Sequence, residues 1–530
     1  MRRLFPRLAA PLALAIVLAA PPVFAADKPD AKPAGEDRGK ARKDALVADA
    51  EADWARPPVT EQAAQSHGAV TVRGQRIAYT ATAGTLTLRD DEGKPIASMF
   101  YTAYTKDGGG PGAKARPLTF LYNGGPGSAT IWLHMGSLSP VRVRTTEPIY
   151  VAPTSYAVEA NPDSLLDRTD LVFLDAIGAG YSRPLGDKAG KDFWGVDPDA
   201  DAFARAVQRY VDKNDRWASP KFLFGESYGT LRNGAVAALL EERGVSLNGI
   251  VFLSSILNYG VRQPGYDQDT MGLLPTFAAT AWYHNRIPNR PADLKAFLDE
   301  VRAFDSGAYA AALAKGTAIS PDEARAVATK MAAYTGLPVD FILRANLRVS
   351  LAHFQTELLR DRGVATGRLD TRYLLNVGDA NADAPIDDPA STAVTGAYVA
   401  GFQDYVGRTL GYKSAIPYRL SARDEGFDWN WKHKAPGSRG TQPAPYTGAD
   451  LAYTMRTNPA MKVLFLNGYF DAATPFYATE YDVAHMALTP ELQKNVAFRY
   501  YDSGHMVYLN PAALHVMHDD LAAWYDMAAR

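Results

Sequence analysis

The sequence contains no cysteine, so no disulfide bond can cross-link the chain. Disulfides matter most to small exported domains, whereas a chain of 530 residues can bury a core large enough to fold without them. The formal net charge is only −2, which gives no reason to expect nucleic acid or an anionic membrane as a partner. Beyond the first residues, no apolar run is long enough for a stable membrane span. The composition, 47% hydrophobic and 22% charged, indicates a globular protein.

Residues 1–25 have the pattern of a secretory signal peptide. Three arginines precede an apolar stretch at residues 8–20, and small residues before Ala26 fit a cleavage site. A retained membrane anchor is the alternative, but the apolar stretch is too short to cross a bilayer. Residues 26–66 are rich in charged residues, alanine and proline, which predicts a disordered or weakly ordered linker. We therefore expect an exported protein, periplasmic or secreted after cleavage near Ala25.

The most informative stretch is a G-x-S-x-G pattern centred on Ser227. The apolar run before it, residues 221–224, predicts a buried strand, and the small and apolar residues 230–240 predict a helix. A serine on the tight turn between a strand and a helix is typical of the nucleophile of an α/β hydrolase. The N–H of Tyr228 would then lie at the start of the helix, where it can donate to an oxyanion. A plain glycine-containing turn is the alternative, which the flanking strand and helix disfavour.

A serine nucleophile needs a base, and the base needs an acid that orients it. On this scaffold the acid follows the serine in the chain and the histidine follows the acid. Asp471 comes just after the strand-like run 462–468, and His505 comes just after the strand-like run 496–501. Catalytic residues collect at the carboxyl ends of strands in open α/β sheets. The sequence therefore predicts a triad of Ser227, Asp471 and His505.

The order of the expected elements indicates the fold class. Residues 69–105 have a β pattern broken by turns, which predicts an antiparallel meander that opens the sheet. Strands and helices alternate over residues 118–257, which predicts a mostly parallel, doubly wound sheet. Residues 258–461 have a largely helical pattern. We expect an α/β-hydrolase core formed by residues 67–257 and 462–530, with a helical cap or lid inserted between core strands at residues 258–461.

Four blocks resemble the signature segments of the serine carboxypeptidases, in the same order. They are NGGPGS at residues 123–128, GESYG at 225–229, NGYFD at 467–471 and GHMV at 504–507. A fifth segment, residues 175–182, is similar to the family's segment after an early core strand. The resemblance implies hydrolysis of C-terminal peptide bonds through an acyl-enzyme on Ser227, peptides with a free C-terminus as substrates, and no metal or organic cofactor. Eukaryotic members usually carry disulfides, so the absence of cysteine indicates a bacterial, exported branch.

The resemblance also implies roles for residues around the serine. The N–H groups of Gly125 and Tyr228 would form the oxyanion hole. Asn123, the N–H of Gly124 and Glu226 would bind the terminal carboxylate of the peptide. A glutamic acid can donate to a carboxylate only when it is protonated.

The chain departs from the family beside this carboxylate site. In the family, a second glutamate on the helix after the glycine loop shares one proton with the first. Residues 128–138 contain no acid, so Glu226 lacks that partner locally. His134 lies in this stretch, but a lone histidine in an apolar helix is more often packed in the core. The departure puts the carboxylate-binding mode in question.

Two other functions therefore stay open. An esterase or acyltransferase would use the same triad on another carbonyl substrate. A non-catalytic binding protein on a hydrolase scaffold is the third alternative, which the presence of nucleophile, acid, base and both oxyanion segments disfavours. An aspartate-rich stretch at residues 379–383 lacks the glycine and the acid that a calcium loop requires, so no metal site is expected. His515 and His518 are expected on the solvated face of a closing helix.

Overall fold

The computed structural model describes residues 57–108, 116–423 and 427–529, which all belong to the compact unit Ala55–Arg530. The expected signal peptide and most of the expected linker lie outside the described residues. The strands of the main sheet are β1 (Ala63–Val72), β2 (Gln75–Arg89), β3 (Pro95–Lys106), β4 (Leu118–Tyr122), β7 (Asp170–Leu174), β8 (Arg183–Pro184), β9 (Lys221–Glu226), β10 (Gly249–Leu253), β13 (Lys462–Gly468) and β14 (Val496–Tyr501).

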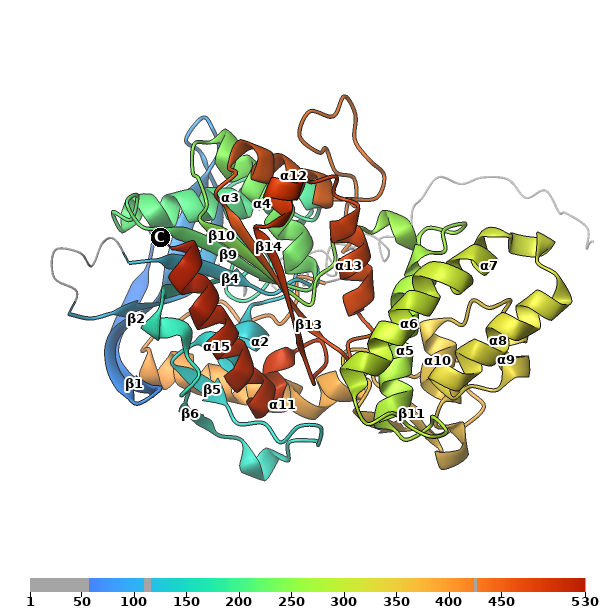
Figure 1. The fold of residues 1–530 in the computed structure, drawn as a ribbon. Helices are drawn as coiled ribbons and strands as arrows, with labels where there is room; N and C mark the ends of the chain where they lie inside the picture. The colour runs from blue at the N-terminus through green and yellow to red at the C-terminus, as the bar shows by residue number, and fades with distance from the viewer. Residues whose placement is uncertain (1–56, 109–115, 424–426, 530) are drawn as a thin grey trace, which may run out of the picture. The chain divides into compact units, whose positions relative to one another are not determined.

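These strands form one ten-stranded sheet in the order β1-β2-β3-β7-β4-β9-β10-β13-β14, with β8 paired to β3 (Figure 1). The pairs from β1 to β7 are antiparallel, and the pairs from β7 to β14 are parallel. The strands β4, β7, β9 and β10 are buried along their whole length, as expected for parallel strands with both faces covered. The predicted α/β-hydrolase fold with a mostly parallel central sheet is thereby confirmed.

The first strand begins earlier in the chain than the sequence pattern indicates. β1 starts at Ala63, inside the range that was predicted as linker, and pairs with β2 along its full length. Its first residues are small or polar, and they alternate between exposed and half-buried positions. An edge strand of this kind needs few large apolar residues, so its composition resembles that of a solvated linker.

Two apolar layers cover the two faces of the sheet. The helices that pack there are α3 (Val196–Lys213), α4 (Tyr228–Glu242), α11 (Pro389–Asp404), α12 (Gly448–Thr457) and α15 (Pro511–Ala528). Residues of α11 and α15 join Phe222 and Phe224 on one face, whereas residues of α3, α4 and α12 join Leu223 on the other face (Figure 1). Successive side chains of β9, the strand that leads to Ser227, therefore point alternately into the two layers.

Residues 258–461, between β10 and β13, divide between two apolar clusters. The first helices are α5 (Gln268–Tyr283), α6 (Leu294–Phe304), α8 (Pro321–Thr335), α9 (Val339–Arg344) and α10 (Leu351–Glu357). They form a third cluster together with Tyr469, Phe470 and Phe476 of the core, and within it Phe277 stacks on Phe354 with ring centroids 3.9 Å apart. The later helices α11 and α12 instead pack on the central sheet. Among the described helices, none is both long enough and apolar enough to cross a membrane.

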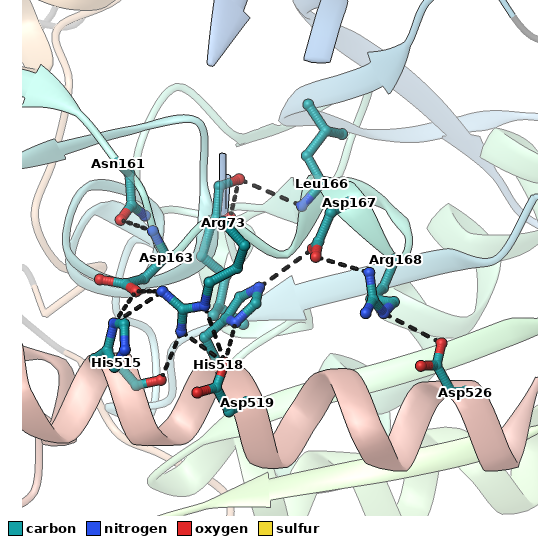
Figure 2. Close-up of polar contacts among 12 residues, drawn as sticks. Arg73, Asn161, Asp163, Leu166, Asp167, Arg168, His515, His518, Asp519 and Asp526 are labelled. Carbon is teal, nitrogen blue, oxygen red and sulfur yellow. Dashed lines mark hydrogen bonds and ion pairs between the residues drawn. The ribbon is translucent and has the colours of Figure 1, made fainter. Parts of the chain in front are cut away.

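A cluster of ion pairs ties the N-terminal hairpin to the last helix (Figure 2). Arg73, in the turn between β1 and β2, lies 2.6 Å from Asp163 and 2.7 Å from Asp519 of α15. His515 Nδ1 lies 3.0 Å from the same oxygen of Asp163. We call these four residues the terminal clasp, because they join segments from opposite ends of the described chain.

The closing helix also contains a buried histidine. His518 is only 1% exposed, and its two ring nitrogens lie within hydrogen-bonding distance of Asp167 and Asp519 (Figure 2). The prediction of a solvated face for His518 is therefore wrong. The carboxylate that receives it comes from a distant loop, so the spacing of residues within α15 alone does not reveal the burial.

We expect Arg73→Gln to lower the free energy of unfolding by about 1–3 kcal/mol, because the Asp163 side chain is only 5% exposed and loses its cationic partner. Urea denaturation followed by circular dichroism measures the change. Lys94→Gln is the control, since Lys94 and Glu92 are both more than 70% exposed, and it should change stability by less than about 0.5 kcal/mol. Equal effects of the two variants would show that the terminal clasp contributes nothing specific.

Candidate active site

Ser227 lies on the sharp turn between β9 and α4. Its backbone has φ 61° and ψ −130°, a conformation that residues with a side chain rarely adopt. The N–H of Ser227 donates to the carbonyl of Leu253 at 3.0 Å, and its carbonyl accepts from Thr230 at 2.8 Å. Ser227 is partly exposed, whereas the residues on either side of it are buried. Ser227 is therefore more accessible than its two neighbours in the turn.

The two glycines of the G-x-S-x-G pattern are required by close backbone contacts. A Cβ atom at Gly225 would collide with the carbonyl of Gly229. A Cβ atom at Gly229 would lie 2.9 Å from the carbonyl oxygen of Tyr122, on the neighbouring strand β4. Backbone segments therefore approach closely on both sides of the serine.

Asp471 and His505, which the sequence predicts as catalytic acid and base, lie in direct contact. His505 Nδ1 lies 2.8 Å from Asp471 Oδ2, and both side chains are buried. A carboxylate can only accept, so the proton lies on Nδ1 and Nε2 is the acceptor nitrogen. Burial lowers the pKa of His505, but the negative charge of Asp471 and its hydrogen bond outweigh burial, so the pKa is raised above the ordinary value.

Asp471 is held in place by donors that the sequence analysis missed. It accepts the N–H groups of Ala473 at 2.8 Å and Thr474 at 2.9 Å, and the hydroxyl of Thr474 at 2.7 Å. The Thr474 hydroxyl also lies 3.1 Å from His505 Nδ1. A hydroxyl three residues after the acid was a local signal, because side chains at this spacing in a tight turn can reach back to the carboxylate.

The loop that carries His505 is fixed by buried polar contacts. The N–H of His505 donates to the carbonyl of Leu369 at 2.7 Å, and the Ser254 hydroxyl donates to the His505 carbonyl at 2.6 Å. Arg372 donates to the Asp502 carbonyl at 2.8 Å and pairs with Asp370 at 2.6 Å. These partners come from distant segments, so no local pattern could indicate them.

The glycine loop after β4 lies directly against the turn at Ser227. A Cβ atom at Gly124 would collide with the backbone nitrogen of Tyr228. Gly125 is exposed and has φ 106°, and no hydrogen bond within the described residues engages its N–H. Tyr228 opens α4, where N–H groups have no partner within the helix. The two N–H groups that were predicted to form the oxyanion hole therefore belong to backbone segments in contact.

Glu226 is buried beside the serine with a tyrosine for a partner. The Tyr508 hydroxyl donates to Glu226 Oε2 at 2.9 Å, and the carboxyl group is 2% exposed. Burial raises the pKa of Glu226 to about 7, against the opposing effects of the His505 charge and of hydrogen bonds from Tyr508 and Asn123. Asn123 Oδ1 accepts the N–H of Leu133 at 2.9 Å, which fixes the orientation of the amide. The predicted carboxylate-binding residues Asn123, Gly124 and Glu226 thus lie around one point.

His134 has no part in this group. Its Nε2 lies 2.7 Å from the Tyr104 hydroxyl, and its ring packs on Phe173. Burial lowers the pKa of His134 to about 3, so the ring is neutral. It is a packed core histidine, as the apolar surroundings in the sequence indicated. Within the described ranges, no group of three or more histidine or acidic side chains is arranged to hold a metal ion.

Comparisons with known proteins agree with this geometry. Residues 74–249 match the family model of the serine carboxypeptidases. No curated protein sequence matches the chain. Among solved structures, a prohormone-processing carboxypeptidase from Saccharomyces cerevisiae matches with a TM-score of 0.52 at 13% identity, over 84% of this chain and 91% of the other.

Two further solved structures match at lower TM-scores. A proline iminopeptidase from Mycobacterium smegmatis has 16% identity and a TM-score of 0.34, over 84% of this chain and all (100%) of the other. A carboxyl esterase from Bacillus coagulans has 11% identity and a TM-score of 0.35, over 84% of this chain and 98% of the other. At 13% identity, the match to the Saccharomyces cerevisiae structure supports the fold alone.

Asp471→Asn should lower kcat by roughly 10⁴-fold, because the amide no longer holds the required tautomer of His505. Hydrolysis of p-nitrophenyl acetate measures the loss. Asp502→Asn is the matched control, since Asp502 lies on the same loop as His505 with its side chain exposed, and it should change kcat by less than about twofold. A similar loss in both variants would contradict the assignment of Asp471.

Proposed function

We propose that this chain, whose residues 74–249 match the serine carboxypeptidases, is a serine-type carboxypeptidase that releases the last residue of a peptide. Ser227 Oγ attacks the carbonyl carbon of the terminal peptide bond while His505 Nε2 takes its proton. His505 then gives that proton to the leaving amine, and the bond breaks to leave an acyl-enzyme. Water attacks this ester with His505 again as base, which frees the shortened peptide and Ser227.

The oxyanion of each tetrahedral intermediate is stabilised by the N–H groups of Gly125 and Tyr228. Backbone donors are fixed before the reaction, so they need no rearrangement as charge develops. One such donor typically lowers the barrier by roughly 3 kcal/mol. Asp471 stabilises the imidazolium form of His505 that exists during each step.

The observation that carries the choice of a carboxypeptidase is the buried carboxyl group next to the nucleophile. With a pKa of about 7, Glu226 is largely protonated in mildly acidic solution and can donate to a carboxylate. Asn123 and the N–H of Gly124 supply further donors beside it. An esterase or acyltransferase has no evident use for a protonated acid at this position.

Export is part of the proposal. The signal-peptide pattern at residues 1–25 and the absence of cysteine support a bacterial protein that acts in the periplasm or outside the cell. Sequencing the N-terminus of the mature protein tests this, with Ala26 as the expected first residue.

A blocked dipeptide with a free C-terminus should be hydrolysed at least about tenfold faster, in kcat/KM, than its C-terminal amide at pH 6, because only the acid can accept from Glu226. Chromatographic detection of the released residue measures both rates. Equal rates, or cleavage of simple esters with neither peptide cleaved, would move the protein to the esterase or acyltransferase class.

The pH dependence of kcat/KM on the free-acid peptide should be a narrow bell. Activity rises as His505 loses its proton, and it falls as Glu226 loses its proton above pH of about 7. Glu226→Gln keeps a donor at every pH, so the descending limb should disappear while the ascending limb stays. A descending limb that persists in Glu226→Gln would assign that ionisation to another group.

Tyr508→Phe should move the descending limb to higher pH. The hydrogen bond from Tyr508 favours the charged form of Glu226, so its removal raises the pKa of the acid further. The same pH profile measures the shift, and kcat at pH 6 should change little. A shift to lower pH would mean that Tyr508 instead favours the neutral acid.

A further inference from the structure

Two exposed arginines contact the backbone of the catalytic segments themselves. Arg423 donates through Nη2 to the carbonyl of Gly125 at 3.0 Å, on the residue proposed as an oxyanion donor. Arg262, at the end of η6 (Gly260–Arg262), donates through Nη2 to the carbonyl of Ala473 at 3.0 Å. Ala473 itself donates its N–H to Asp471, so a single residue links this arginine to the catalytic acid.

A third arginine reaches the same place from another segment. The carbonyl of Arg368 accepts the N–H of Ala472, the residue after Asp471, at 3.1 Å. Its charge is close enough to His505 to oppose the protonation of the ring. The charges of Arg262, Arg368 and Arg423 all lower the pKa of Tyr259, against the effect of burial, so the three guanidinium groups lie in the vicinity of this one side chain.

Within the part of the chain that the structure describes, few counter-charges neutralise these three positive charges, and Arg262 also acts on the buried carboxyl group of Asp482. Arg262 has a loose ion pair with Asp269 at 3.5 Å, and neither of the other two makes an ion pair with a described residue. The nearby carboxylate of Asp388 is directed at backbone, where it accepts the N–H groups of residues 368 and 369. Gathering like charges with few counter-charges is unfavourable, and it creates a positive field beside the catalytic residues.

The cluster rests on an aromatic surface. The Arg262 guanidinium lies 5.3 Å from the ring centroid of Tyr259, and that ring packs on Trp431 at 4.5 Å. Contacts of this kind restrict a flexible side chain, so less conformational freedom is lost when it binds a ligand. Tyr259 and the three arginines all belong to the inserted segment, and their contacts with Gly125, Ala472 and Ala473 place this surface against the core at the catalytic strand ends.

We propose that Arg262, Arg368 and Arg423 form an anion-recognition cluster that binds a carboxylate of the substrate, which makes acidic peptides the favoured substrate class. The inference rests on the function proposed above and deepens it. Guanidinium groups match carboxylates in both charge and geometry. The carboxylate has two sources, a side chain of Asp or Glu beside the cleaved bond and the terminal carboxylate of the peptide.

The test compares substrate pairs that differ only in one carboxylate. Blocked dipeptides with Glu or Gln before the cleaved bond, each as acid and as C-terminal amide, separate the two sources. A pair of p-nitrophenyl esters, the hemisuccinate and the valerate, reports on an acyl-side carboxylate without requiring peptidase activity. Four enzymes are compared. They are the wild type, a triple variant that combines Arg262→Gln, Arg368→Gln and Arg423→Gln, the corresponding triple lysine variant, and the control Arg408→Gln. Arg408 is an exposed arginine of η10 (Tyr405–Thr409), paired with Asp404.

The triple glutamine variant should lose roughly tenfold or more in kcat/KM on the carboxylate-bearing member of a pair relative to the neutral member, so that the ratio between the two substrates falls. Lysine should restore part of the loss, and the wild-type preference should shrink as salt is added. If the loss is larger for the Glu peptide than for the Gln peptide, the cluster binds the side-chain carboxylate. If the loss is larger for the free acid than for the amide, the cluster binds the terminal carboxylate.

Equal losses on charged and neutral substrates would overturn the cluster. Uncleaved peptides together with a preference for the hemisuccinate would reject the proposed peptidase function and keep the cluster. Cleavage of the peptides without any preference for a carboxylate would support the peptidase function and reject the cluster.

Discussion

The site depends on the direct contact between two backbone turns. The glycine loop after β4 and the turn after β9 approach so closely that a side chain at Gly124 would collide with the backbone of Tyr228. The strands β4 and β9 are neighbours in the parallel sheet, so their carboxyl ends bring the two turns together. Holding Ser227 at positive φ costs about 1–3 kcal/mol, which the buried layers on both faces of the sheet must offset. The strain at Ser227 and the position of the two N–H groups proposed for the oxyanion hole therefore have one structural origin.

The buried acid follows from the same arrangement. Glu226 ends β9 immediately before the nucleophile, and Tyr508 reaches it from the segment just after His505. One loop thus supplies both the base and the partner of the acid. The resemblance implies two carboxyl groups that share a proton, whereas burial is the main cause that raises the pKa of Glu226 to about 7 here. The proposed carboxylate-binding role therefore does not require a second acid within residues 128–138.

Much of this could be predicted from the sequence, and the limits have a physical cause. The alternation of strands and helices identified the sheet, and the rule that functional residues follow strand ends selected Asp471 and His505, which the structure brings within 2.8 Å of each other. Tyr508 and Arg372 were missed because their roles depend on contacts between distant segments. His518 was misjudged for the same reason. The start of β1 was missed because an edge strand of small residues lacks the apolar pattern that marks a buried strand.

The central claim is that Ser227 carries the acyl group of a peptide during release of its last residue. Rapid mixing with a blocked dipeptide that has a free C-terminus, followed by acid quench and mass spectrometry of the digested protein, tests it most directly. The account predicts a mass increase equal to the blocked acyl residue, located on the fragment that contains Ser227 and absent from Ser227→Ala. Release of the C-terminal residue without an adduct on that fragment, or with an adduct elsewhere, would contradict it.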